Sequence, residues 1–227
     1  MRKTRINKMS FALALTWILH GGVIAQHKPG SYFEGVVEYT MQVEGTDLSP
    51  ELASKIPRGF TLYLKDASSR LEMATDLTDL TVLADNADRS AITLMTIMGK
   101  NLAIRTDSTQ LNKALGEIGK FDIHYLPDEK TILGYPCKKA ILLRKNTADT
   151  TVLWYTTALR PIFPSSNQFL PNGNWFPMEV QATHQGARTT LRVRTIDKGP
   201  VEDSLFVVPE GYRIIEQGKI REQLLGL

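Results

Sequence analysis

The residue types that nucleophilic chemistry needs surround a single cysteine in this 227-residue chain, Cys137. His124 and Asp128 precede it within a short stretch, and Lys138 and Lys139 follow it directly. A catalytic thiol needs a nearby base and a lowered pKa. In a strand, however, Lys138 points to the opposite face and only Lys139 shares the face of the thiol. No feature of the sequence sets the register that would pair His124 with Cys137.

The alternative is a buried thiol that follows a turn. Gly134, Tyr135 and Pro136 precede Cys137. Glycine adopts positive φ and proline restricts its own φ, so this tripeptide suits a change of chain direction before a strand. Free cysteine is among the most buried residue types. We therefore expect a buried Cys137, no catalytic residues and no enzymatic activity.

Metal and cofactor motifs are missing from the sequence. A single cysteine excludes an intramolecular disulfide and a cysteine metal cluster. His27, His124 and His184 have no zinc-site spacing, and the Asp-rich stretch 85–88 lacks the other ligands of a calcium loop. Phosphate-binding glycine loops and nucleophile elbows do not occur either. The chain is expected to bind no metal and no cofactor.

The N-terminus has the pattern of a secretory signal peptide. Four basic residues precede the apolar run FALALTWIL, which is too short to span a bilayer, and a small residue, Ala25, ends the segment. We expect residues 1–25 to be removed after Ala25, residues 26–32 to form a flexible tail, and residues 33–227 to form a single β-rich domain. Because no cysteine follows the predicted cleavage site, no lipid anchor is expected, and the periplasm is the predicted location.

Removal of this segment changes the charge. The whole chain has 27 basic and 24 acidic residues, and residues 1–25 hold four of the basic ones and none of the acidic ones. The remaining 23 basic and 24 acidic residues give a net charge of −1. This balance offers no support for nucleic-acid binding, which is typical of a basic folded domain. No later segment is apolar enough for a transmembrane span.

Alternating apolar and polar residues predict a mainly antiparallel α+β fold of about ten strands. The stretch 34–45 alternates with period two, and hairpins are predicted around Asp66 and around Gln185-Gly186. A helix is predicted over 108–119, and shorter helices over 47–57 and 215–227. These elements suit a curled sheet or half-open barrel wrapped round one or two short helices.

Three motifs resemble those of a known group of proteins. KTILGYPCKKAIL, TVLWYTT and SLFVVPEGYRII are similar to segments of uncharacterised envelope proteins of Gram-negative bacteria, which look related to the LolA/LolB-like lipoprotein-carrier half-barrel superfamily. The resemblance runs from about Phe33 to Ile214. It implies a curled antiparallel sheet with an apolar concave face and no enzymatic activity. The ligand-binding residues of the carriers form no short motif that transfers to positions here.

A long irregular segment, 158–174, carries apolar side chains that need something to cover. Its composition suits a lid over the concave face and a plug in the core equally well. If it is a lid, strand parity and loop position predict an apolar ligand-binding set: Leu62, Leu64, Met73, Leu94, Trp154, Phe163, Phe169 and Trp175.

Two functions follow from these predictions. The first is a non-enzymatic protein that binds a lipid, an acyl chain or another apolar small molecule in a half-barrel cavity. The second is a filled-core scaffold or interaction module with an envelope protein as its partner. Arg188, Arg192 and Arg194 share one strand face and would suit acidic headgroups or a partner protein, but a solvated face with nearby acids is the favoured interpretation.

Overall fold

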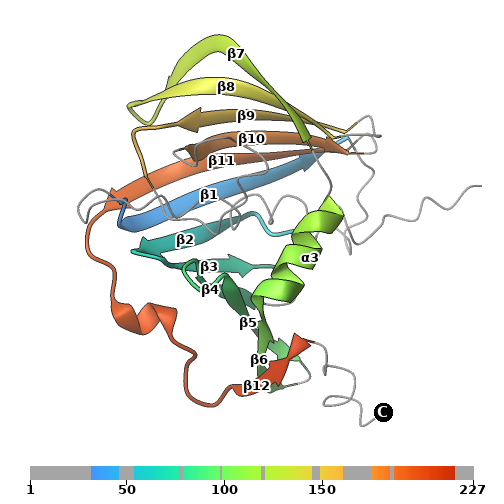
Figure 1. Ribbon diagram of the computed structural model, residues 1–227, viewed down its shortest axis with the longest axis vertical. Helices are drawn as coiled ribbons and strands as arrows, with labels where there is room; N and C mark the ends of the chain where they lie inside the picture. Colours follow the sequence, from blue (N-terminus) through green and yellow to red (C-terminus); the bar gives the residue numbers. More distant parts are fainter. Residues whose placement is uncertain are drawn as a thin grey trace, which may run out of the picture.

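The computed structural model describes residues 32–45, 54–76, 79–97, 99–118, 121–144, 149–160, 175–184 and 187–217. Twelve strands form one sheet in the order β12-β6-β5-β4-β3-β2-β1-β11-β10-β9-β8-β7 (Figure 1). Their bounds are β1 Gly35–Glu44, β2 Gly59–Lys65, β3 Ser68–Ala74, β4 Asp79–Asp85, β5 Ser90–Ile97, β6 Lys100–Thr106, β7 Phe121–Ile132, β8 Tyr135–Arg144, β9 Thr150–Thr156, β10 Phe176–His184, β11 Ala187–Lys198 and β12 Arg213–Glu216.

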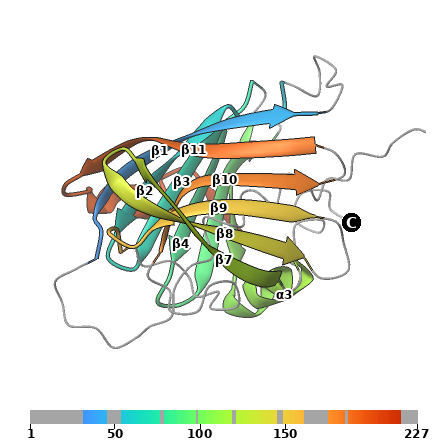
Figure 2. The same ribbon diagram turned by 90° about the horizontal axis from the view of Figure 1, so that it is seen from above.

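The pairing is antiparallel except between β12 and β6, which run parallel. β2 to β6 form one meander and β7 to β11 form another, and β1 joins them by pairing with both β2 and β11. The sheet curls strongly, so that the two halves lie at an angle to each other (Figures 1 and 2). The prediction of a mainly antiparallel, curled and open sheet is therefore confirmed, with two strands more than expected.

The hydrophobic core lies on one side of this sheet, which we call the concave face. In β1 as far as Met41, and throughout β2, every second residue is buried there, as the alternation in their sequences predicts. The buried core residues on strands β1–β4 of this face are Val37, Tyr39, Met41, Phe60, Leu62, Leu64, Leu71, Met73 and Val82. Those on β8–β11 include Ala140, Leu142, Leu153, Tyr155, Met178, Val180, Leu191 and Val193. We call the opposite side the outer face.

One α-helix longer than a turn occurs within the described ranges, α3 (Ser108–Ile118), as predicted for residues 108–119. Its first turn is closed by a capping box: the Gln110 N–H donates to Asp107 Oδ1 over 2.8 Å, and the Asp107 N–H donates to Gln110 Oε1 over 3.1 Å. α3 connects β6 to β7, which lie near opposite edges of the sheet, and it contacts β5.

The outer face of β3–β6 is covered by the segment that follows β11. This segment, 199–212, contains the 3₁₀ helix η1 (Asp203–Phe206) and leads to β12. Its Val208 and Tyr212 pack against a second small cluster of Leu83, Leu94 and Ala103. Figures 1 and 2 show α3 and η1 on opposite sides of this half of the sheet.

Two of the predicted helices lie partly outside the described residues, and their described parts are not α-helical. The C-terminal helix predicted over 215–227 is wrong at its start, because Ile215 and Glu216 belong to β12, where Ile215 pairs with Ile104 of β6 and is fully buried. Its remainder from 218 onward lies outside the described residues. The helix predicted over 47–57 lies outside them up to residue 53, and residues 54–56 form a turn and a bend. The predicted signal peptide, 1–25, lies outside them as well.

Candidate functional site

Three of the predicted ligand-binding residues share the concave face. Leu62 lies opposite Leu71, and Leu64 lies opposite Ser69, in the β2–β3 hairpin. Met73 lies opposite Leu80 of β4. Leu62 and Leu64 are fully buried and Met73 is nearly so. Strand parity therefore placed these three side chains correctly on one face of the sheet, the concave face.

Leu94 does not belong to this group, and its assignment to the same face is corrected by the strand pairing. Leu94 of β5 lies opposite Thr81, which lies opposite Glu72 on the outer face. It is buried there by the segment 199–212, through Val208 and Tyr212. The apolar character of Leu94 was predicted correctly, but the cover on its side of the sheet comes from a segment more than a hundred residues later.

Trp154 needs the same correction. It lies opposite Lys139 of β8 and Glu179 of β10, whereas its neighbour Leu153 lies opposite Ala140 and Val180 on the concave face. The indole of Trp154 therefore lies on the outer face. The ammonium groups of Lys130 and Lys139 lie 4.2 Å and 5.5 Å from its ring centroid, so the ring is part of a cationic cluster.

The residues at the ends of the long irregular segment are buried in the core. Leu159 is the second residue of the segment and Trp175 follows its last, and their exposed fractions are 2% and 8%. Phe163 and Phe169, which were also predicted to contact a ligand, lie outside the described residues. Trp175 thus contributes to the apolar core on the concave side, as a lid hinge or a plug would.

An aromatic cluster fills one end of the core. The rings of Tyr39 and Phe60 stack with centroids 4.6 Å apart, and Phe176 lies 6.4 Å from Tyr39 and 6.1 Å from Phe33. The Tyr39 hydroxyl donates to the carbonyl of Pro177 over 2.7 Å. Burial raises the pKa of this phenol well above its ordinary value. This end of the concave face is packed by the protein's own side chains.

Sequence reasoning missed a polar residue on the same face. Ser69 lies between Leu64 and Ala84 in the strand pairing, and it is 1% exposed. Its Oγ has no hydrogen-bond partner. The alternation of β3, with Ser69, Leu71 and Met73 on one parity, was the available indication of its direction. A serine at an apolar position is easily read as a turn residue, since it follows the turn at Asp66-Ala67.

Cys137 is buried, as predicted, with an exposed fraction of 1%. Its Sγ lies 3.3 Å from the Tyr135 carbonyl oxygen. Burial raises the pKa of the thiol, against a smaller lowering by a backbone hydrogen bond and by Lys130. His124 lies opposite Ile141, whereas Cys137 lies opposite Lys130, so the β7–β8 register separates the imidazole from the thiol. The arrangement is that of an unreactive thiol.

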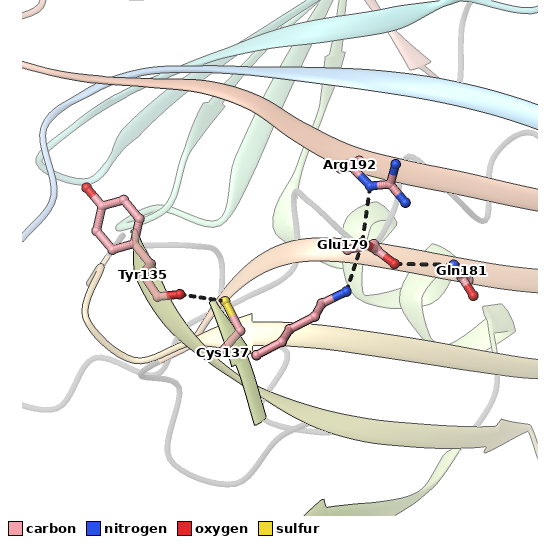
Figure 3. A network of polar contacts seen from close by, with 6 residues as sticks. Tyr135, Cys137, Glu179, Gln181 and Arg192 are labelled. Atoms are coloured by element: carbon pink, nitrogen blue, oxygen red, sulfur yellow. Dashed lines mark hydrogen bonds and ion pairs between the residues drawn. The ribbon is translucent and has the colours of Figure 1, made fainter. Parts of the chain in front are cut away.

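Next to Cys137, the outer face carries a network around a buried carboxylate, Glu179 (Figure 3). Its Oε2 accepts from Lys130 Nζ at 3.0 Å and from Arg192 Nε at 3.1 Å, and its Oε1 accepts from Gln181 Nε2 at 3.2 Å. Two cations and an amide therefore satisfy a carboxylate whose side chain is 8% exposed. Such a saturated group is a structural ion pair rather than a base.

The arginine stripe of β11 has acidic neighbours along its length. Arg192 pairs with Glu179, Arg194 Nε lies 3.8 Å from Glu38 Oε2, and Arg188 lies opposite Glu44 in the β1–β11 pairing. The stripe is thus a solvated face whose charges are largely balanced, as the favoured interpretation of the sequence held.

An open depression of about 660 Å³ lies beside β1–β4 and is lined by residues of both faces, among them Phe60 and Met73 of the concave face. Its lining is mixed and charged, and includes Glu38, Arg58, Glu72, Asp76 and Arg194. Glu72 accepts from Arg70 Nε at 2.6 Å and from the Tyr63 hydroxyl at 3.2 Å.

Within the described parts of the chain, no group of three or more His, Cys, Asp or Glu is placed to hold a metal ion. Nor does any helix there have the length and apolar character needed to cross a membrane.

The chain was compared with known proteins. No family model matches it, and no curated protein matches it. Among solved structures, PNGF-II superposes with a TM-score of 0.50 at 14% identity, over 84% of this chain and 33% of that chain. This chain thus spans about a third of the length of PNGF-II.

Two other solved structures match nearly whole chains. LprF from Mycobacterium bovis has a TM-score of 0.36 at 11% identity, over 74% of this chain and 88% of that chain. The LolA superfamily protein NE2245 from Nitrosomonas europaea has a TM-score of 0.36 at 12% identity, over 80% and 92%. A member of the LolA superfamily, the group that the sequence motifs resemble, is thus among the solved structures that match. The likeness to PNGF-II, at 14% identity, is one of fold.

Proposed function

We propose that this protein is an exported, non-enzymatic binding protein of the cell envelope, and that its curled sheet holds an apolar ligand such as a lipid or an acyl chain. The observation that carries the proposal is the continuous apolar concave face, which extends over β1–β4 and β8–β11 as one cluster. Apolar concave surfaces with few polar groups are the usual form of sites for such ligands.

The chemistry of the two faces supports an apolar ligand. The buried carboxylate Glu179 and its cations lie on the outer face, away from the concave core. On the concave face, the buried side chains are those of Leu, Val, Met, Phe and Ala with few exceptions. A ligand there would be held mainly by apolar contact, which stabilises binding in proportion to the area removed from water.

The amount of helix also supports the proposal. α3 has 11 residues and is thus about 16 Å long. Strands lie about 4.8 Å apart, so a helix of this length crosses only a few of the twelve. On β5, where α3 makes its contacts, the concave-face residues Ala91, Thr93 and Met95 keep partial exposure. Part of the concave face is therefore reachable beside the helix.

The surroundings of Cys137 argue against a catalytic role for its thiol. The thiol is buried, its pKa is raised, and His124 lies at a different position in the β7–β8 register. A thiol in this state contains little thiolate at neutral pH, and thiolate is the reactive form.

A second function, a filled-core interaction module, is favoured by a different observation. Leu62, Leu71, Leu142 and Leu153 are already completely shielded from solvent by the protein's own atoms. A ligand that reaches these side chains must displace part of that cover. In a scaffold the cover stays in place, and function resides on the surface.

Native mass spectrometry of protein purified from bacterial envelopes tests the proposal. A co-purifying mass of lipid size that is lost on solvent extraction supports the binding protein. The same spectrum checks export, since processed protein begins at Gln26. Extracted protein that neither carries nor regains an apolar ligand in a titration with a fluorescent naphthylamine favours the scaffold instead.

A further inference from the structure

Ser69 is a polar group placed where the fold otherwise buries apolar ones. Its side chain points to the concave face, it is 1% exposed, and its Oγ has no hydrogen-bond partner. Most buried hydroxyl groups in proteins are hydrogen-bonded, since an unpaired one is destabilising. The unpaired hydroxyl of Ser69 can therefore form a hydrogen bond with a bound ligand.

The surroundings of Ser69 are unusually small side chains. Across β3, β4, β5 and β6, strand pairing places Ser69, Ala84, Ala91 and Thr106 in one row. The next row inward on the same face holds larger residues on the same strands: Leu71, Val82, Thr93 and Ile104. On these strands the concave face thus carries its smaller side chains at the end of the sheet where the β2–β3 and β4–β5 turns lie.

This end of the sheet is also partly accessible, and it carries charges of both signs. Ala91 and Thr106 are partly exposed, unlike Ser69 and Ala84. α3 begins two residues after Thr106, and Arg89 of the β4–β5 turn donates to Asn112 Oδ1 of α3 over 2.6 Å. A guanidinium group therefore lies at the junction between the turn and the helix, together with the carboxylates of Asp85 in the turn and Asp107 before the helix.

We propose that the row Ser69–Ala84–Ala91–Thr106 receives the oxygen-bearing end of an acyl ligand, and that Ser69 Oγ donates a hydrogen bond to its carbonyl or carboxylate oxygen. This inference rests on the proposed function, because it assumes that an acyl chain occupies the concave face. The chain then runs from the small row toward Leu62, Leu71 and Val82, which are apolar and lie one row inward. Ser69 orients the ligand and the leucines hold it.

Two kinds of ligand carry such an acyl oxygen: a free fatty acid has a carboxylate, and a lipid has an ester carbonyl. The test therefore uses laurate, methyl laurate and dodecane, which have similar chains and differ in their oxygen atoms. The binding of each compound is measured by its ability to displace a fluorescent naphthylamine from the processed protein after solvent extraction.

Ser69→Ala is expected to weaken laurate binding about five- to tenfold, the effect of one hydrogen bond, and to leave dodecane binding unchanged. A matching loss for methyl laurate identifies the ester carbonyl as sufficient, and a loss for laurate alone identifies the carboxylate. The melting temperature of the variant should not fall, because the hydroxyl has no partner to lose. Ser68→Ala is the matched control, since Ser68 precedes Ser69 in β3 and points to the other face.

Three outcomes contradict the inference, and they can be told apart. If wild-type protein binds laurate and methyl laurate and Ser69→Ala binds both equally well, the role of Ser69 is refuted while the proposed function stands. An equal loss for dodecane shows a packing effect and refutes the hydrogen bond. If wild-type protein binds none of the three compounds, the proposed function fails together with this inference.

Discussion

Lys130 and Glu179 form an ion pair of 3.0 Å although two strands, β8 and β9, separate β7 from β10 in the sheet. The contact is possible because β7 arches over its neighbours, as Figure 1 shows, and because the pairing of β7 with β8 shifts between Leu126 and Glu129. A β-bulge of this kind bends a strand and re-aims its side chains. The ion pair thus links β7 to β10 across the two strands that lie between them.

Replacement of Glu179 by alanine should lower the free energy of unfolding by about 1–3 kcal/mol, as measured by urea denaturation. The expected loss is below the value for a fully buried pair, because the side chains of Lys130 and Arg192 are 33% and 55% exposed. Lys138→Ala is the control, since this exposed lysine is a neighbour in β8. A double-mutant cycle between Lys130 and Glu179 should give a non-zero coupling energy. Additive effects of the two substitutions would mean that the contact does not stabilise the arch.

Tyr39 makes stability depend on pH in the alkaline range. Because burial raises its pKa above the ordinary value of 10.0, the folded state keeps its proton where the unfolded state loses it. The contribution is therefore complete below pH 10, and it is lost as the pH rises above 10 toward the folded-state pKa, at up to about 1.4 kcal/mol per pH unit.

Tyr39→Phe should remove this tyrosine's share of the alkaline slope and cost about 1–2 kcal/mol at neutral pH, because the Pro177 carbonyl loses its donor. Urea denaturation at a series of pH values from neutral to strongly alkaline checks both effects. Identical slopes in the two proteins would show that Tyr39 titrates normally.

The thiol of Cys137 should react very slowly with an aromatic disulfide reagent in the folded protein and rapidly after unfolding in urea. Burial shields it, and its raised pKa keeps the thiolate fraction low. Cys137→Ser should retain ligand binding and lose about 1–3 kcal/mol of stability, since the hydroxyl enters an apolar site. Fast modification of the native thiol contradicts its burial, and a loss of binding at unchanged stability points to a role in function.

The pair Phe163→Ala and Phe169→Ala separates a lid from a plug in the segment between Leu159 and Trp175. For a lid, binding of a fluorescent apolar probe weakens while the melting temperature changes little. For a plug, stability falls by several kcal/mol, since a buried Phe→Ala change costs about 3–5 kcal/mol. Ser165→Ala with Ser166→Ala in the same segment is the control. Unchanged probe binding with a large fall in melting temperature refutes the lid.

Local patterns were sufficient to predict the first half of the fold. The alternation of β1, the β2–β3 hairpin and the helix at Ser108–Ile118 could be read from the sequence, because each depends on neighbouring residues. The positive φ of Gly134, +81°, likewise agrees with a turn before Cys137. These features need no knowledge of the distant chain.

The faces of later strands could not be read in the same way. Leu94 alternates with Thr93 and Met95, so its parity alone does not say which side is covered, and its cover, Val208 and Tyr212, is remote in sequence. Trp154 has an apolar side chain, which suggested the concave face, but its ring contacts the ammonium groups of two lysines on the outer face. Ile215 looked helical and instead pairs with β6. In each case a contact between distant segments decides the outcome.

β1 joins the two meanders of the sheet, and this has a consequence for the order of folding. Gly35 of β1 lies opposite Lys198 of β11, so the sheet becomes continuous only after most of the chain is present. Closing so large a loop precedes the gain from pairing, and sheets dominated by such contacts fold slowly. In a nascent chain, β1 therefore has one unpaired edge until β11 has been synthesised. Such an edge can pair with other chains, so this seam makes the unfinished protein a natural client for chaperones that shield exposed strands.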